Sequence, residues 1–376
     1  MSRLAAPGEL GIVDVGTLHT EAGARIPGAQ IAYRRWGELH GLESGRTNII
    51  LVEHSLTSGP EADEWWPGII GPGRALDTDR FCVVCTNSIG GFHGSTGPSS
   101  PHPEDGRAWG SRFPGISIRD QVTAELAFLD ALGIPAVHAV VGGSMGGARA
   151  LEWAAMAPDR LNAAGVIAVS ARASAWQIGI QAAQIDAIEG DPHWHGGDYY
   201  DTGHSPREGL ATARRIAHLT YRGELELDER FGVEAQTGEN PLGPYRDPQQ
   251  RFAVESYLDY QARKLTARFD AGSYVTLTDA LNRHDIGRGR GGLNRALSSI
   301  HVPMFIAGVD TDILYPYHQQ EHLSRNVGNL LGMAKISSPV GHDAFLAEHR
   351  QMDHVLRRFI HLAEESVHGN AASHFG

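Results

Sequence analysis

The sequence predicts an α/β protein in which a mostly parallel sheet is flanked by helices. Short apolar runs bounded by turn residues are typical of buried strands. Such runs occur at residues 48–53, 80–85, 137–141, 164–169 and 303–308. Helical patterns separate several of these runs, and strands that alternate with helices favour a parallel sheet.

The remaining elements follow along the chain. Residues 29–36 read as a half-buried strand ahead of the buried ones. Residues 120–132 have the pattern of an amphipathic helix that ends just before the strand at 137–141. Residues 148–156 after that strand are good helix formers and predict a second helix.

The alternation of predicted strands and helices is interrupted between residues 171 and 296. This stretch has mostly helical patterning, with loops rich in Gly, Pro and Asp, and no clear strand run. The economical interpretation is a helical insertion between two strands of one sheet. We therefore expect a core domain formed by residues 1–170 and 297–376, with residues 171–296 inserted as a helical lid.

Composition excludes several classes of function. The 376 residues include 32 Lys and Arg against 44 Asp and Glu, a net charge of −12, and 41% are hydrophobic. These values fit a globular enzyme or binding protein rather than a disordered chain. The acidic balance argues against nucleic acid or an anionic membrane as the main partner, because both require basic surface.

The sequence also carries expectations about the cellular compartment. No apolar run has the length of a signal peptide or of a membrane-spanning helix, so the expectation is a soluble cytoplasmic protein. Cys82 and Cys85 cannot form a disulfide framework, which fits a reducing compartment. Because residues three apart on a strand face opposite sides, both are expected in the core rather than in a metal site.

The strongest motif is GGSMG at residues 142–146, a G-x-S-x-G pattern between a predicted strand and a predicted helix. This context is typical of a nucleophile elbow, where flanking glycines leave room for a sharp turn. Ser144 is the expected nucleophile. The following helix N-terminus aims backbone N–H groups at a developing oxyanion.

A serine nucleophile needs a histidine base that is oriented by an acid, and in this fold type the acid and then the histidine follow the serine. Asp310 and Asp312 both lie just past the strand at 303–308, and the sequence alone does not separate them. His342 follows Gly341 in a loop ahead of a helix and is the expected base.

Two further patterns look like cofactor sites but lack the right context. The GRGRGG stretch at 287–292 fits G-x-G-x-x-G but follows a helical pattern rather than a strand, so a dinucleotide site is not expected. HQQEH at 318–322 fits a zinc-peptidase pattern, but 20 histidines make such matches common. We expect no catalytic metal and no permanently bound cofactor.

Beyond these motifs, the chain resembles a known family over nearly its whole length. It is similar to homoserine O-acetyltransferases of the α/β-hydrolase superfamily, most closely to actinobacterial members. The matching stretches, in family order, are residues 87–100, 113–122, 142–147, 219–223, 268–274 and 341–345. The resemblance implies the α/β-hydrolase fold with an inserted helical lid.

The resemblance also assigns catalytic positions. It implies Ser144 as nucleophile, Asp312 as acid and His342 as base, although Thr311 stands where the family has Ser. The family's oxyanion hole uses the backbone N–H after the nucleophile, here that of Met145. Its second donor lies in a His-Ala-Leu-Thr segment that reads HSLT here, which implies the N–H of Leu56.

Substrate contacts follow from the chemistry of an amino acid and from the same resemblance. A carboxylate favours a bidentate arginine and an ammonium favours a carboxylate. The family's arginine on a lid helix matches Arg214, with Arg215 as its rival. Tyr221 lies seven residues on, two helical turns away on the same face. Asp343, directly after the histidine, would bind the amine.

The resemblance implies a ping-pong reaction in methionine biosynthesis, carried out by a cytoplasmic homodimer. An acetyl group would pass from the co-substrate acetyl-CoA to the serine and then to the γ-hydroxyl of L-homoserine. The alternatives are a succinyl donor, serine as acceptor, or a serine esterase or thioesterase with the same triad. A non-catalytic binding protein ranks lowest, because all three triad positions are intact.

Overall fold

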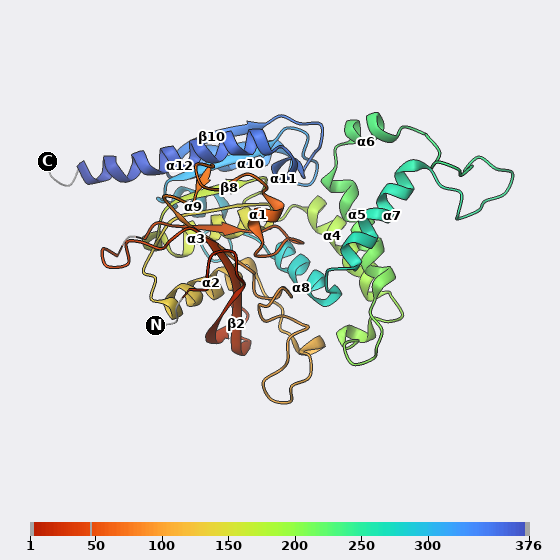
Figure 1. Ribbon diagram of the computed structural model, residues 1–376, viewed down its shortest axis with the longest axis horizontal. Helices are drawn as coiled ribbons and strands as arrows, with labels where there is room; N and C mark the ends of the chain where they lie inside the picture. Colours follow the sequence, from red (N-terminus) through yellow and green to blue (C-terminus); the bar gives the residue numbers. More distant parts are fainter. Residues whose placement is uncertain (1–3, 46, 373–376) are drawn as a thin grey trace.

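The computed structural model describes residues 4–45 and 47–372 and contains the predicted mostly parallel sheet (Figure 1). Its eight strands lie in the order β1-β2-β6-β3-β7-β8-β9-β10. The strands are β1 (Gly11–His19), β2 (Arg25–Trp36), β3 (Ile49–Glu53), β6 (Cys82–Thr86), β7 (Val137–Gly143), β8 (Leu161–Ile167), β9 (Met304–Val309) and β10 (Leu330–Ile336). The six strands β6, β3, β7, β8, β9 and β10 run parallel. At one edge, β1 pairs antiparallel with β2, and β2 pairs antiparallel with β6.

The predicted strands correspond to β2, β3, β6, β7, β8 and β9, whereas neither edge strand, β1 nor β10, was predicted. β1 pairs with β2 through irregular register, with shifts on either side of Gly16. β10 is half exposed along most of its length, so it lacks the continuous burial that makes a strand visible in sequence. A short pair, β4 (Ile70–Gly71) and β5 (Leu76–Asp77), forms a separate ribbon.

Helices cover both faces of the sheet. One hydrophobic cluster contains side chains of α2 (Ile118–Leu132), α3 (Met145–Met156), α9 (Leu293–Ser298) and α10 (Tyr317–Asn326). The cluster on the other face contains side chains of α1 (Ala62–Trp65), α11 (Ala344–Ala347) and α12 (His349–Ala372). Cys82 belongs to the first cluster and Cys85 to the second, so the prediction of two core cysteines on opposite faces is confirmed.

A helical segment joins β8 to β9. It contains α4 (Ala175–Glu189), α5 (Arg207–Tyr221), α6 (Glu224–Phe231), α7 (Ala253–Thr266) and α8 (Ala271–Asn282), and α9 follows. Figure 1 shows α5, α6 and α7 standing to one side of the sheet. The chain leaves and re-enters the core side by side, because Ala173 N–H donates to the His284 carbonyl and Ile286 N–H donates to that of Ala171.

Within the described residues, no helix is both long enough and apolar enough to cross a membrane. The carboxyl ends of β3, β7, β9 and β10 meet along one edge of the sheet, because these strands are parallel members of one sheet. Loops at this edge are where sheets of this type place their functional groups. The segments with the predicted catalytic residues all follow these four strand ends.

Candidate active site

Ser144 sits on a sharp turn between β7 and α3. Its backbone has φ 57° and ψ −122°, and a positive φ is uncommon for a residue other than glycine. Neighbouring glycines make the turn possible. A Cβ atom on Gly142 would lie 2.6 Å from the Cβ of Glu53, and one on Gly146 would overlap the Glu53 carbonyl oxygen. The turn therefore depends on the absence of side chains on both sides of the serine.

The structure brings Ser144, His342 and Asp312 together from three strand ends. His342 Nε2 lies 2.9 Å from Ser144 Oγ, and His342 Nδ1 lies 2.6 Å from Asp312 Oδ2. The Asp312 carboxylate is held in turn, because its Oδ1 accepts the backbone N–H groups of Leu314 and Tyr315, each at 2.8 Å. All three side chains are buried. This is the hydrogen-bonded chain that a serine nucleophile requires.

Asp310, the rival acid, lies elsewhere. Its side chain is exposed, and its Oδ1 accepts the Ser338 N–H at 3.2 Å rather than a histidine. Sequence position alone could not separate the two acids, because they are two residues apart in one loop. Their hydrogen-bond partners separate them.

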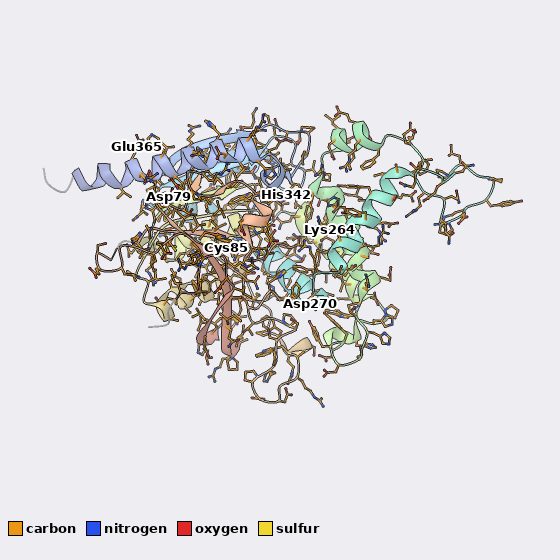
Figure 2. The ribbon with its side chains drawn as sticks, viewed as in Figure 1. Asp79, Cys85, Lys264, Asp270, His342 and Glu365 are labelled. Carbon is orange, nitrogen blue, oxygen red and sulfur yellow. The ribbon has the colours of Figure 1, made fainter. Side chains whose placement is uncertain are left out.

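The environment of His342 favours its charged form. Burial lowers the pKa of His342, but the charge and hydrogen bond of Asp312 and the charge of Asp343 outweigh burial and raise it. The rings of Tyr221, Tyr315 and Phe345 surround the imidazole, with centroids 5.8, 5.4 and 5.4 Å away. In Figure 2, His342 lies where the sheet meets the helical segment.

The two backbone amides that were predicted to form an oxyanion hole belong to Met145 and Leu56. Met145 is the first residue of α3, where helix N–H groups have no partner within the helix. Leu56 lies in the loop after β3 and lines the same small cavity as Ser144. Among the described residues, neither amide donates to a protein acceptor.

The cavity beside Ser144 has a volume of about 190 Å³. Two arginines and one aspartate are among the residues that line it. The lining residues are Ser55, Leu56, Thr57, Ser58, Trp65, Ser144, Arg214, Tyr221, Arg268, His342, Asp343, Phe345 and Leu346. Two guanidinium groups and one carboxylate in so small a space suit a ligand that carries both a carboxylate and an ammonium.

Arg214 and Tyr221 lie together on α5, and the Arg214 guanidinium carbon is 5.3 Å from the centroid of the Tyr221 ring. The buried Nε of Arg214 has no hydrogen-bond partner among the described residues. Arg215 instead pairs with Asp259 on α7, with Nε 2.9 Å from Oδ1. The structure thus places Arg214, and not its neighbour, in the cavity.

Asp343 is the N-cap residue of the short helix α11, but its side chain makes no capping hydrogen bond. Its carboxylate lies 4.0 Å from Arg222 Nη1, at the limit of an ion pair. Burial raises the pKa of Asp343, and the nearby charges of Arg214, His342 and Arg222 only partly oppose that shift. A partly buried carboxylate with so loose a partner suits an ammonium ligand.

Sequence reasoning missed Arg268 and Trp65. Arg268 follows α7 and donates from Nη1 to the Thr57 carbonyl at 2.9 Å, which joins the helical segment to the loop of Leu56. It opens the RFDAGSY stretch at 268–274, so the motif marked the region but not the side chain. No sequence motif pointed to Trp65, because its place in the cavity depends on where α1 packs in the folded chain.

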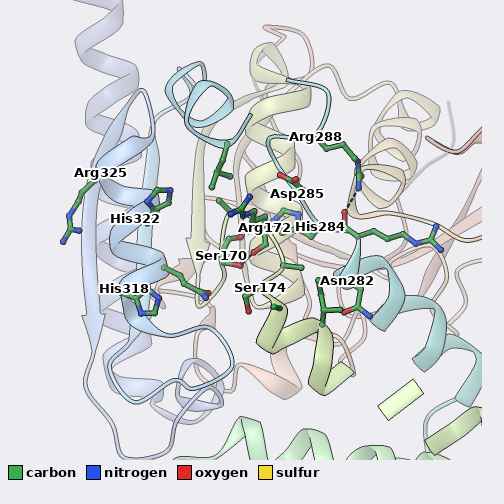
Figure 3. A pocket seen from close by; sticks show the side chains of 17 residues that line it. Ser170, Arg172, Ser174, Asn282, His284, Asp285, Arg288, His318, His322 and Arg325 are labelled. Atoms are coloured by element: carbon green, nitrogen blue, oxygen red, sulfur yellow. Dashed lines mark hydrogen bonds between the residues drawn. The ribbon is translucent and has the colours of Figure 1, made fainter. Parts of the chain in front are cut away.

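A larger cavity of about 960 Å³, whose lining Figure 3 shows, has no residue of the triad among its lining residues. It is bounded by the two crossings between core and helical segment and by α10. His318 and His322 of the HQQEH pattern line it, while Glu321 pairs with Arg325. Within residues 4–45 and 47–372, no cluster of three or more metal-binding side chains is present.

The GRGRGG stretch forms the loop between α8 and α9. Dinucleotide fingerprints start directly after a strand, and this loop follows a helix instead. The expectation that it is not such a site therefore agrees with its place in the fold.

A serine on a sharp strand-to-helix turn, with Asp and His on later loops of a mostly parallel sheet, defines the class of proteins with the α/β-hydrolase fold. A family model described as the alpha/beta hydrolase fold matches residues 48–348, so the chain belongs to that superfamily. Homoserine O-acetyltransferase of Corynebacterium efficiens is 69% identical over 362 residues, 96% of each chain. The chain therefore belongs to the homoserine O-acetyltransferase family, as the sequence predicted.

Solved structures agree with this placement. A crystal structure of homoserine O-acetyltransferase from Bacillus anthracis has a TM-score of 0.83 and 25% identity, covering 94% of this chain and 97% of its own. A crystal structure of an esterase has the same TM-score at 24% identity, covering 94% and 99%, and supports the fold alone.

Proposed function

We propose that this chain transfers an acetyl group from acetyl-CoA to the γ-hydroxyl of L-homoserine through an acyl-serine intermediate, in methionine biosynthesis. The name and high identity of the Corynebacterium relative support the overall reaction. The observation that carries the mechanism is the hydrogen-bonded chain from Ser144 through His342 to Asp312.

In the first half-reaction, His342 Nε2 takes the proton of Ser144 Oγ as the oxygen attacks the thioester carbonyl. The N–H groups of Met145 and Leu56 stabilise the oxyanion of the tetrahedral intermediate. The C–S bond then breaks, His342 gives its proton to the departing thiolate, and the acetyl group remains on Ser144. Asp312 stabilises the imidazolium that forms between these two proton transfers.

In the second half-reaction, L-homoserine occupies the cavity beside the acetyl-enzyme. Arg214 binds its carboxylate, Asp343 its ammonium, and the Tyr221 ring packs against Arg214. His342 removes the proton of the γ-hydroxyl, which attacks the acetyl carbonyl, and the proton then passes to Ser144 Oγ. Placing the hydroxyl beside the ester favours transfer over hydrolysis, because a positioned group has a high effective concentration.

Replacing Arg214 with methionine is expected to raise the KM for homoserine about 10- to 100-fold, since charged hydrogen bonds contribute roughly 1.5–3 kcal/mol. Acetylation of Ser144 by p-nitrophenyl acetate should change little, because that ester carries no carboxylate. Steady-state kinetics with both substrates measure the two effects. Arg215→Met is the matched control, and an equal rise in KM there would refute the assignment of Arg214.

We further propose that residues 171–296 act as a lid on the core of residues 1–170 and 297–376, and that two chains pair through the lid. Large apolar side chains exposed on its helices support pairing: Trp176, Ile178, Leu219, Leu225 and Tyr260. A sedimentation mass near twice 40.6 kDa would support the homodimer, and a mass of one chain would exclude it.

We place the enzyme in the cytoplasm, since both cysteines are free and the proposed donor is acetyl-CoA.

The function is tested by thiol release from acetyl-CoA or succinyl-CoA with homoserine, serine or no acceptor. The proposal expects homoserine to accelerate CoA release from acetyl-CoA well above the rate in water, with O-acetylhomoserine as product. An unchanged rate would favour an esterase or thioesterase. Faster turnover with succinyl-CoA or with serine would reassign the donor or the acceptor.

A further inference from the structure

We propose that His54 is a positioning residue that holds the Ser55–Leu56 peptide group so that the Leu56 N–H points at the oxyanion. This inference rests on the proposed function, because it concerns the oxyanion hole of that reaction. It assigns a role to a side chain that lies outside the triad and is not among the residues that line the small cavity.

Both ring nitrogens of His54 have backbone partners, and these partners determine its tautomer. The backbone N–H of Ser88 lies 3.0 Å from His54 Nε2, and a backbone N–H can only donate. Nε2 is therefore unprotonated, so the proton of the neutral ring is on Nδ1. Nδ1 lies 2.8 Å from the Ser55 carbonyl oxygen and donates to it.

The Ser55 carbonyl and the Leu56 N–H belong to one peptide group. In a trans peptide these two groups point in opposite directions, so fixing the carbonyl fixes the N–H. The Ser55 oxygen also accepts the Ser58 N–H at 3.1 Å, which gives it two donors. Together they set the plane of the peptide, and the Leu56 N–H is left without a protein acceptor among the described residues.

Neighbouring carbonyls of the same loop are held as well. Arg149 of α3, five residues after Ser144, donates from Nη2 to the His54 carbonyl at 2.9 Å. Its Nη1 lies 2.7 Å from Glu125 Oε1 and 2.9 Å from Glu53 Oε2, in a fully buried cluster. The two guanidinium bonds to the loop, from Arg149 and from Arg268, bracket the Ser55–Leu56 peptide but do not contact it.

Burial makes the His54 ring a stable support. The residue is 1% exposed, and burial followed by the charge of Arg149 holds the pKa of His54 well below its usual range. The ring thus stays neutral, with its Nδ1 proton in place, at any pH at which His342 can act as a base. A second histidine near the catalytic centre is in this way kept out of proton transfer.

Two substitutions of His54 distinguish the role of Nδ1 from the role of Nε2. The amide of asparagine at position 54 occupies the place of Nδ1 and can still donate to Ser55, whereas the amide of glutamine reaches the place of Nε2 and loses that donor. We expect H54Q to slow the acetylation burst with p-nitrophenyl acetate about 10- to 100-fold, approaching the loss of one oxyanion donor. H54N should stay within about fivefold of the unchanged protein.

Affinity for a trifluoromethyl ketone gives a second readout, because its serine adduct carries an oxyanion in the same hole. H54Q should weaken this inhibitor by the same factor as it slows acetylation, with the KM for homoserine unchanged. The matched control is H284N, because His284 is also buried and its Nε2 bonds the Ser170 carbonyl outside the small cavity, a contact that the shorter asparagine loses. It should leave the burst and the inhibitor affinity unaltered.

Equal losses in H54N and H54Q, or full activity in H54Q, would overturn the role of His54. Nitrogen NMR of the unchanged protein provides a test that needs no variant: a proton on Nε2 rather than Nδ1 would also overturn it. If the unchanged protein itself shows no acetylation burst, the proposed function fails instead, so the two failures are distinguishable.

Discussion

Replacing Ser144 with alanine should abolish the acetyl-enzyme and reduce kcat by about 10,000-fold or more, the scale of loss seen when a triad nucleophile is removed. The reason is local. Ser144 Oγ is the oxygen within hydrogen-bond reach of His342 Nε2, and the strained turn holds it there without a capping bond. Incubation with [¹⁴C]acetyl-CoA, followed by denaturation and counting of protein-bound label, measures the adduct.

Ser174→Ala is the matched control. Ser174 also precedes a helix, but its backbone is ordinary, with φ −87°, and its side chain accepts the Gln177 N–H as a normal N-cap. Its removal should lower the free energy of unfolding by about 0.5–2 kcal/mol and leave the acetyl adduct intact. A labelled adduct that persists in Ser144→Ala would disprove the nucleophile assignment.

Asp312→Asn is expected to reduce kcat about 10,000-fold while leaving the fold in place, because an amide in this position stabilises the wrong histidine tautomer. The Asp312 carboxylate accepts the Nδ1 proton of His342 and two backbone N–H groups, whereas an asparagine would offer an N–H where acceptors are required. Single-turnover acetylation by acetyl-CoA measures the loss, and the melting temperature shows whether the fold survives.

The same substitution should move the pH profile. Only neutral His342 can accept the serine proton, so activity falls as the pH drops through its pKa. Asp312 and Asp343 raise that pKa above its ordinary value of 6.5, which places the acid limb of kcat/KM above pH 6.5. In Asp312→Asn the acid limb should shift to lower pH.

Asp310→Asn removes an exposed carboxylate from the same loop and should change neither the rate nor the acid limb. If Asp310→Asn slowed acetylation as strongly as Asp312→Asn, the hydrogen bond from His342 to Asp312 would not be the one that matters for catalysis.

Much of the core was accessible from sequence because its signals are local. The run at 80–85 is apolar after Arg80, and it overlaps β6 (Cys82–Thr86), whose five residues are all buried. The GGSMG motif could be recognised as a nucleophile elbow because a predicted strand precedes it and a predicted helix follows it in the chain. β10 was not predicted because most of its residues are only half buried. Its sequence therefore lacks the continuous apolar run of a buried strand.

The site could be predicted only in part, because some of its residues come together only in the folded chain. Ser144 and His342 could be proposed from their own neighbourhoods, but Trp65 and Arg268 enter the cavity from α1 and from the helical segment. No property of either residue's neighbours in sequence predicts that placement. The role that we infer for His54 likewise depends on Ser88, which is 34 residues away in the chain.

Three features can be predicted from the amino-acid sequence: the alternation of strands and helices, the elbow with its serine, and the family. The alternation and the elbow depend on residues that are neighbours in the chain, and the family is recognised from sequence similarity alone. The resemblance favoured Asp312 over Asp310 and Arg214 over Arg215, and the tertiary structure supplies a physical reason for each choice. In each pair the residues are the same in kind and almost the same in position, and they differ only in what the folded chain brings to them: His342 to Asp312, and Asp259 to Arg215.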